Sequence, residues 1–139
     1  MTAYSYDVVD RLLTVVNRNG GTTISSYTYT LDGVGNRTQT VDTTGTSTFT
    51  YDSLYRLTGV TYPNADTQSY TYDAMGNRLT KVHNGTTTSS TYNDGDQTTA
   101  VGGVAYTQDN NGNQTAVGSD SYSWDAENRL SAATIGGVS

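Results

Sequence analysis

The sequence predicts an all-β protein, an array of antiparallel β-hairpin repeats that form one curved, spiralling sheet. Three observations indicate this fold. A short unit recurs seven times along 139 residues. Aromatic residues stand two positions apart before each turn, the spacing of side chains on one face of a strand. Gly, Asn and Asp gather where the chain must reverse. Because each repeat is completed by its neighbours, the array predicts architecture more directly than chemistry.

An acid or its amide anchors each copy, and we treat residues 1–139 as a single array of about seven copies. The anchors are Asp7, Asp32, Asp52, Asp73, Asn93, Asp109 and Asp125. Their spacing varies, which is common in a diverged array.

A first strand leads into each anchor. Its aromatic positions are Tyr4, Tyr6, Tyr29, Phe49, Tyr51, Tyr70, Tyr72, Tyr92, Tyr106, Tyr122 and Trp124, with small Ser or Thr residues between them. This alternation is typical of a half-buried strand.

A turn follows each anchor and ends at a cation or an amide four or five residues later. The arginines are Arg11, Arg37, Arg56, Arg78 and Arg129, and the longer spacings carry a glycine at Gly35, Gly76 or Gly112. The four-residue and five-residue spacings alternate. Two interpretations stay open: a structural period of two copies with odd and even turns at different places, or chance alternation.

A second strand, rich in Thr and Val, leaves each turn, as in residues 11–16, 56–62, 78–82 and 129–133. Branched side chains favour the pleated surface of a sheet. Each copy is therefore a hairpin, and about a dozen strands are expected. Pro63 is expected in a turn at residues 62–66.

Composition excludes several classes of partner. The net charge is -6 and only seven residues are Lys or Arg, which argues against nucleic acid and anionic membranes. Without cysteine there are no disulfides or thiolate metal sites. No apolar run is long enough for membrane insertion, and no signal peptide is visible. Aliphatic residues are few, but twelve tyrosines at regular positions oppose disorder.

The segment Tyr72-Asp73-Ala-Met-Gly76-Asn77-Arg78-Leu79 resembles the YD repeat of the Rhs family, which also occurs in toxin-complex cocoon proteins and in teneurins. Two further segments, residues 51–57 and 124–130, match with the glycine replaced. The resemblance implies a long antiparallel sheet that spirals into a hollow shell, which in toxins encloses a cargo polypeptide. The sequence departs from the toxin pattern because it contains no Asp-Pro pair and no cargo domain, so it does not predict self-cleavage.

Other chemistry is weighed against simpler structural interpretations. The Asp and Arg positions fit turn bonds and stacking on Tyr better than catalysis. The tyrosine rows fit a sheet wall or, alternatively, a sugar-binding face. Residues 93–96 and 109–113 are similar to calcium loops but lack the full ligand pattern. His83 is the only histidine, and three Asn-X-Thr sequons begin at Asn36, Asn84 and Asn113.

The sequence therefore predicts a non-catalytic structural repeat protein, a secreted or cell-surface building element of bacterial origin, without cofactor or metal. Open sheet ends predict end-to-end self-association into fibres, or pairing with flanking repeats. One alternative is an arc of an Rhs-type polymorphic-toxin shell. Another is a carbohydrate-binding repeat module, with a glycan as partner.

Overall fold

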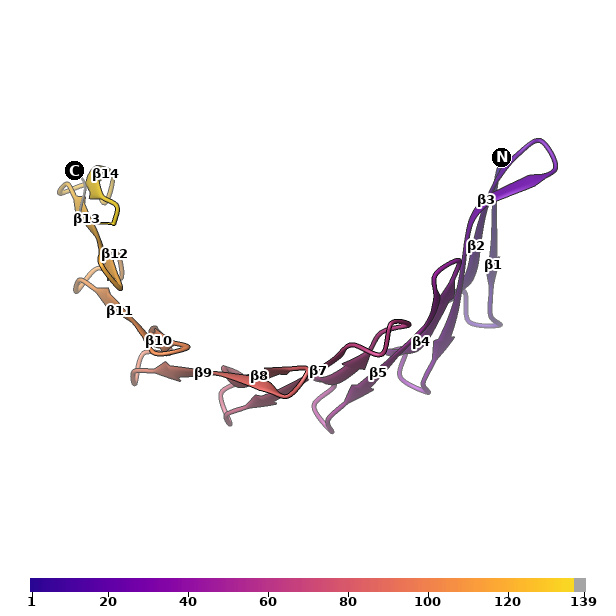
Figure 1. Ribbon diagram of the computed structural model, residues 1–139, viewed down its shortest axis with the longest axis horizontal. Helices are drawn as coiled ribbons and strands as arrows, with labels where there is room; N and C mark the ends of the chain where they lie inside the picture. Colours follow the sequence, from indigo (N-terminus) through magenta and orange to yellow (C-terminus); the bar gives the residue numbers. More distant parts are fainter. Residues whose placement is uncertain (137–139) are drawn as a thin grey trace. The chain divides into compact units, whose positions relative to one another are not determined.

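The computed structural model describes residues 1–136 and contains only strands, turns and bends (Figure 1). The strands follow one another as β1 (Thr2–Tyr6), β2 (Leu12–Asn19), β3 (Thr22–Leu31), β4 (Arg37–Asp42), β5 (Gly45–Tyr51), β6 (Leu57–Thr61), β7 (Thr67–Tyr72), β8 (Arg78–His83), β9 (Thr86–Tyr92), β10 (Thr98–Val101), β11 (Val104–Gln108), β12 (Gln114–Val117), β13 (Asp120–Trp124) and β14 (Leu130–Thr134). The prediction of an all-β array of antiparallel hairpins is confirmed.

Sheet order follows chain order from β1 to β14 without a crossover. The chain divides into two compact units, which we describe separately. The first comprises Met1–Tyr70 and Val82–Gly85, and the second comprises Thr71–Lys81 and the described residues from Thr86 onward.

Every anchor starts a backbone turn of the same length. The anchor N–H donates to the carbonyl four residues later, and the N–H three residues later donates back to the anchor carbonyl, as in Asp7 with Arg11 and Asp10. The residue before the last position has a positive φ, whether it is Gly35 at 100° or Tyr55 at 62°. This is a type I turn followed by a left-handed residue. Of the two interpretations left open, the one that places odd and even turns at different positions is wrong. The backbone is constant, and only the side chain in the fourth position alternates.

The register between successive hairpins is also constant. The residue seven after one anchor pairs with the residue four before the next, as in Gln39 with Thr48 and Ala100 with Ala105. The same offset holds for Thr14 with Thr28, Gly59 with Ser69, and Ala116 with Ser121. Unequal repeat spacing is therefore absorbed at the opposite strand ends, where linkers join the hairpins.

The linker turns are mostly two residues long. Positive φ values at Asn84 and Gly85, and at Gly102 and Gly103, fit turns that match the natural twist of paired strands. The linker at Tyr62–Asp66 is longer and repeats the anchor-turn backbone, because the Tyr62 N–H donates to the Asp66 carbonyl. The expected turn around Pro63 is present.

The two sheet faces differ in exposure. Along β5, β7 and β13 the aromatic side is half-buried while intervening Ser and Thr residues are exposed. Only Val60 and Ser90 are buried in the described chain, at 5% and 6% exposure. The sheet therefore has no centre comparable to that of a globular domain, and each hairpin relies on its neighbours for cover.

Candidate functional site

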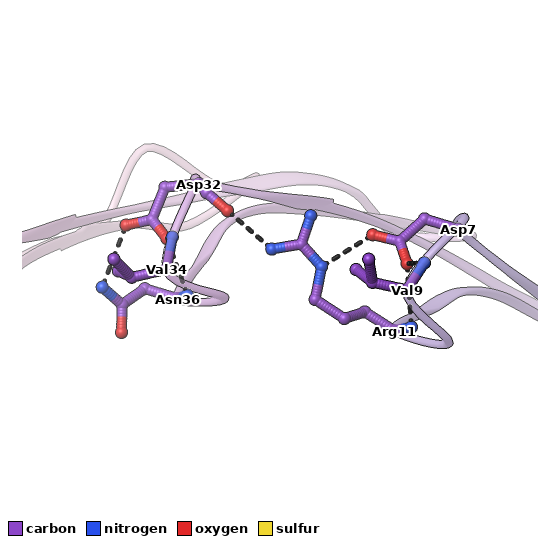
Figure 2. Close-up of polar contacts among 6 residues, drawn as sticks. All are labelled: Asp7, Val9, Arg11, Asp32, Val34 and Asn36. Atoms are coloured by element: carbon purple, nitrogen blue, oxygen red, sulfur yellow. Dashed lines mark hydrogen bonds and ion pairs between the residues drawn. The ribbon is translucent and has the colours of Figure 1, made fainter.

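The anchor turns are the strongest candidates for functional positions, since each gathers several polar groups on one carboxylate. In the first copy, Asp7 Oδ1 accepts the N–H groups of Val9 and Arg11 at 2.9 Å, and Oδ2 accepts Arg11 Nε at 2.6 Å (Figure 2). Three donors that the turn would otherwise leave unpaired are satisfied by one side chain.

The side chain in the fourth position after the anchor has two forms. In three copies it is an arginine whose Nε reaches the carboxylate: Asp7 with Arg11, Asp52 with Arg56 and Asp125 with Arg129. In three others it is an asparagine whose Nδ2 does so, at 2.9 to 3.0 Å: Asp32 with Asn36, Asp73 with Asn77 and Asp109 with Asn113. Both forms supply the same planar N–H in the same place.

The fifth copy uses amides only. Asn93 Oδ1 accepts the N–H groups of Gly95 and Gln97, both at 3.0 Å, and Asn93 Nδ2 donates to Gln97 Oε1 at 2.8 Å. An ion pair is therefore not needed to build the turn.

Hydrogen bonding lowers the pKa of every anchor carboxylate below its ordinary value of 3.8. The main cause is the Arg11 N–H at Asp7, the Arg56 N–H at Asp52 and the Arg129 N–H at Asp125. The Asn36 and Asn113 amides lower the pKa of Asp32 and Asp109.

At Asp73, burial raises the pKa, but the bonds from Asn77 and from the turn outweigh this effect and lower it overall. The six anchor carboxylates therefore remain ionised at neutral pH.

Neighbouring anchor turns also contact one another. Arg11 Nη1 donates to the Asp32 carbonyl at 3.0 Å, which ties the first turn to the second (Figure 2). In the second unit, Asn77 Nδ2 donates to Asp96 Oδ1 and Asn113 Nδ2 donates to Asn128 Oδ1, both at 2.7 Å. Side chains thus tie three pairs of neighbouring turns to each other.

The residue before the anchor forms a second bond between hairpins in four copies. Its side chain donates to the backbone carbonyl of the residue five after the preceding anchor. The four bonds are Tyr51 Oη to Arg37, Tyr92 Oη to Arg78, Gln108 Nε2 to Thr98 and Trp124 Nε1 to Gln114, at 2.8 to 3.0 Å. We call these the inter-hairpin bonds. Sequence reasoning missed Gln108, and the signal was a donor side chain at this position in six copies, Leu31 being the exception.

The opposite face carries a ladder of hydroxyl pairs, one in most hairpins. The pairs are Ser5 with Thr14, Thr50 with Thr58, Thr71 with Thr80, Thr91 with Thr99 and Thr107 with Thr115, at 2.6 to 3.1 Å. Cross-strand hydroxyl pairs add modestly to sheet stability.

The remaining predicted site residues lie on the aromatic face or in the turns. Phe49 pairs with Val60, and Tyr106 and Tyr122 occupy the same position in later copies. The Arg37 guanidinium lies 3.9 Å from the Tyr29 ring centroid. Tyr70 donates to Gln68 Oε1. Tyr4 and Tyr6 in β1 are exposed by 58% and 55%. The importance of these residues to the repeat stays a prediction.

Other predicted chemistry finds few supporting groups. Among residues 1–136, no cluster of three or more His, Cys, Asp or Glu side chains could hold a metal. In the calcium-like segments, Asn93 Oδ1 and both carboxylate oxygens of Asp109 accept turn bonds. His83 is exposed at the end of β8. No helix in the described chain is long and apolar enough to cross a membrane.

Each sequon asparagine already donates its amide. Asn36 donates to Asp32 and Asn113 donates to Asp109. Asn84 donates to Asp66 at 2.8 Å and, with Asn64, lowers the pKa of that carboxyl. A glycan would replace one of the two N–H groups of the amide, so Asn113, which donates to both Asp109 and Asn128, would lose one of its two bonds.

A hollow of 620 Å³ lies beside the longest linker. Thr44, Tyr62, Pro63, Asn64, Asp66 and Gln68 line it. It combines one aromatic ring with carboxylate and amide groups.

The teneurin YD-shell family model matches residues 34–137. Similar solved structures include a mutant Tc holotoxin pore of Photorhabdus luminescens, with 22% identity and a TM-score of 0.75. A crystal structure of TcdB2-TccC3 without its hypervariable C-terminal region has 21% sequence identity to this chain and a TM-score of 0.73. Each likeness covers 96% of this chain but 9% of the other, so this chain spans about a tenth of those proteins. At this identity the likeness concerns the fold. No curated protein matches the chain in sequence.

Proposed function

Because this chain belongs to the teneurin YD-shell family, we propose that it is a non-catalytic wall segment of a larger YD-repeat shell. In this proposal its terminal strands pair with further hairpins of the same kind, and the completed shell encloses a cargo polypeptide. The resemblance to Rhs repeats supports a bacterial protein that acts outside the cell, secreted or at the cell surface.

One observation carries this proposal. The terminal strands leave exposed the residue types that neighbouring hairpins cover elsewhere. Tyr6 is 55% exposed and Leu130 is 54% exposed, whereas Tyr51 and Leu57 at the same repeat positions are half-buried. Unpaired strand edges are sites where another strand adds.

A structural role also accounts for the polar groups. The anchor carboxylates and the arginines four residues later are bonded to each other and to the turn backbone. Groups held in this way stabilise a turn and are poorly placed to exchange protons with a substrate.

The proposal is tested by adding an eighth hairpin. A second copy of residues 104–117 is attached after Ala133 through a Gly-Gly turn. Two residues also separate the paired Val101 and Val104, so the added strand can pair with β14 in the same register. We expect Tm to rise by roughly 2–4 °C for each kcal/mol gained, because the new hairpin covers β14. The control carries proline at the added positions of Thr107 and Ala116, which cannot complete the sheet bonds. An added hairpin that stays unfolded, with Tm equal to the control, contradicts the proposal.

A second candidate, carbohydrate binding, is favoured by the hollow beside Tyr62. Aromatic rings stack on sugar rings. Carboxylate and amide groups form hydrogen bonds with sugar hydroxyl groups. A glycan array with the wild type, Tyr62→Ala and the exposed-tyrosine control Tyr55→Ala tests it. Binding lost only in Tyr62→Ala supports this function, and no binding by the wild type removes it.

A further inference from the structure

Three kinds of contact join successive hairpins, and the register is the one that recurs most widely. The first is the register, in which the residue seven after one anchor pairs with the residue four before the next. It holds at five junctions although the linkers differ in length. A hairpin edge therefore specifies the position of the strand that it accepts.

The second contact is the inter-hairpin bond. The donor precedes an anchor by one residue and the acceptor carbonyl follows the preceding anchor by five, as in Tyr92 with Arg78 and Trp124 with Gln114. The third contact is the turn-to-turn bond from Arg11 to the carbonyl of the next anchor, Asp32.

The edges of β1 and β14 each carry one half of these contacts. At β1, Tyr6 is the residue before an anchor, and its hydroxyl has no hydrogen-bond partner within residues 1–136. At β14, Leu130 follows the last anchor by five residues and supplies the matching carbonyl. Arg129 occupies the position of Arg11. Its Nη2 pairs with Glu127, and its side chain is 73% exposed against 36% for Arg11.

We propose that the β1 edge of a second copy of this chain docks on the β14 edge of the first, head to tail. The register then pairs Ala132 with Ala3 of the second copy. The Tyr6 hydroxyl of the second copy donates to the Leu130 carbonyl, and the Arg129 guanidinium donates to the Asp7 carbonyl of the second copy. This inference rests on the proposed wall function and names the partner of the open edges.

A second copy fits for two reasons. It offers the register found at five internal junctions, together with the donor and acceptor groups of the inter-hairpin bond and of the turn-to-turn bond. The paired positions are small, since Ala3 and Ala132 replace the Thr28 and Thr14 of the first internal junction. Because the two edges differ, the contact is heterologous and repeats in one direction, giving rings or fibres.

Cysteine pairing tests the register, and the natural chain has no cysteine to interfere. Ala3→Cys and Ala132→Cys chains are mixed and oxidised, and the disulfide-linked pair is measured by non-reducing electrophoresis and mass spectrometry. The control replaces Ala132→Cys with Ala133→Cys. Ala132 pairs with Ser123 and Ala133 with Tyr122, so their side chains lie on opposite faces. We expect the linked pair in clear excess with Ala132→Cys, because disulfides need Cβ atoms about 4 Å apart.

Tyr6→Phe tests the donor, with Tyr4→Phe as the matched control in the same strand. Sedimentation velocity over a range of concentrations measures the dissociation constant of the pair. We expect Tyr6→Phe to raise it about two- to tenfold, the effect of one neutral hydrogen bond, and Tyr4→Phe to leave it unchanged.

Equal cross-linking at Ala132 and Ala133, or equal affinities for Tyr6→Phe and Tyr4→Phe, overturns this inference. The eighth-hairpin experiment separates the two proposals. If the added hairpin stabilises β14 while the separate chains remain monomeric, the wall segment stands and the second copy is rejected. If neither experiment shows pairing at the edge, both proposals fall.

Discussion

At the scale of the residue, one planar acceptor organises each turn. The Asp52 carboxylate accepts two backbone N–H groups and the Arg56 Nε, while Asn93 does the same work with an amide. Geometry therefore matters more than charge in forming the turn. Charge adds a dependence on pH.

We expect the protein to lose stability in acid because of its aspartate anchors. Their folded pKa values lie below the ordinary 3.8, so the unfolded chain binds protons more readily. The stabilisation is fully present above the unfolded pKa and is lost as pH falls below it through the folded pKa. Urea unfolding at a series of pH values from 5 downward should show this decline.

Two opposite substitutions test the origin of the acid dependence. Asp52→Asn should lower stability at neutral pH, because Nδ2 cannot accept the Arg56 bond, and should flatten the decline in acid. Asn93→Asp should steepen it, since a new carboxylate accepts the same N–H groups. If stability falls with pH equally steeply in both variants and in the wild type, the anchor carboxylates are not the cause of the acid dependence.

The left-handed backbone at Tyr55 leads us to expect that glycine at this position stabilises the protein. Tyr55 has a φ of 62°, where a side chain costs about 1–2 kcal/mol, and its ring is 58% exposed. Tyr55→Gly should raise the free energy of unfolding by about 1 kcal/mol. Ser53→Gly, in the same turn but outside the positive-φ residues, should lower it by roughly 0.5–1 kcal/mol. Denaturant titration measures both, and a loss in Tyr55→Gly comparable to that in Ser53→Gly would count against the explanation.

At the scale of the element, a hairpin is held by its turn and by bonds to the hairpin before it. The inter-hairpin bonds accept Tyr, Gln or Trp because each reaches one carbonyl with one N–H or O–H group. Leu31 has no such group, so the junction between the first two hairpins lacks this bond. The turn-to-turn bond from Arg11 lies at that junction.

We expect that removing the hydroxyl of one inter-hairpin bond lowers stability measurably. Tyr92→Phe should lower the free energy of unfolding by about 0.5–1.5 kcal/mol, because the Arg78 carbonyl loses its donor while the ring packing is kept. Tyr106→Phe is the matched control, as the Tyr106 hydroxyl has no hydrogen-bond partner in the described residues. Thermal unfolding followed by circular dichroism distinguishes them. Identical effects would show that the bond contributes little.

The strands, hairpins and aromatic face could be predicted from the sequence, because period-two alternation and turn residues act locally. The constant turn could not, since Arg37 and Arg78 suggested longer turns although both begin strands and Asn36 and Asn77 occupy the fourth position. For Gln108 the sequence offers only a donor side chain at a shared repeat position. Its acceptor, the Thr98 carbonyl, is brought near by strand pairing. Local patterns predict elements, whereas contacts between elements need the register.

At the scale of the whole molecule, stability is distributed along the chain. With only Val60 and Ser90 buried among the described residues, no central packing ties all hairpins together. Arrays of this kind gain stability from each repeat and from each interface between neighbours. Terminal hairpins have one interface fewer, which is why their edges suit further strands.

Amide hydrogen exchange, read strand by strand, tests this account most directly. We predict the fastest exchange in β1 and β14, slower exchange in strands with two paired neighbours, and slowing of β14 when an eighth hairpin is added. Equal protection from β1 to β14, unaffected by the added hairpin, would contradict it.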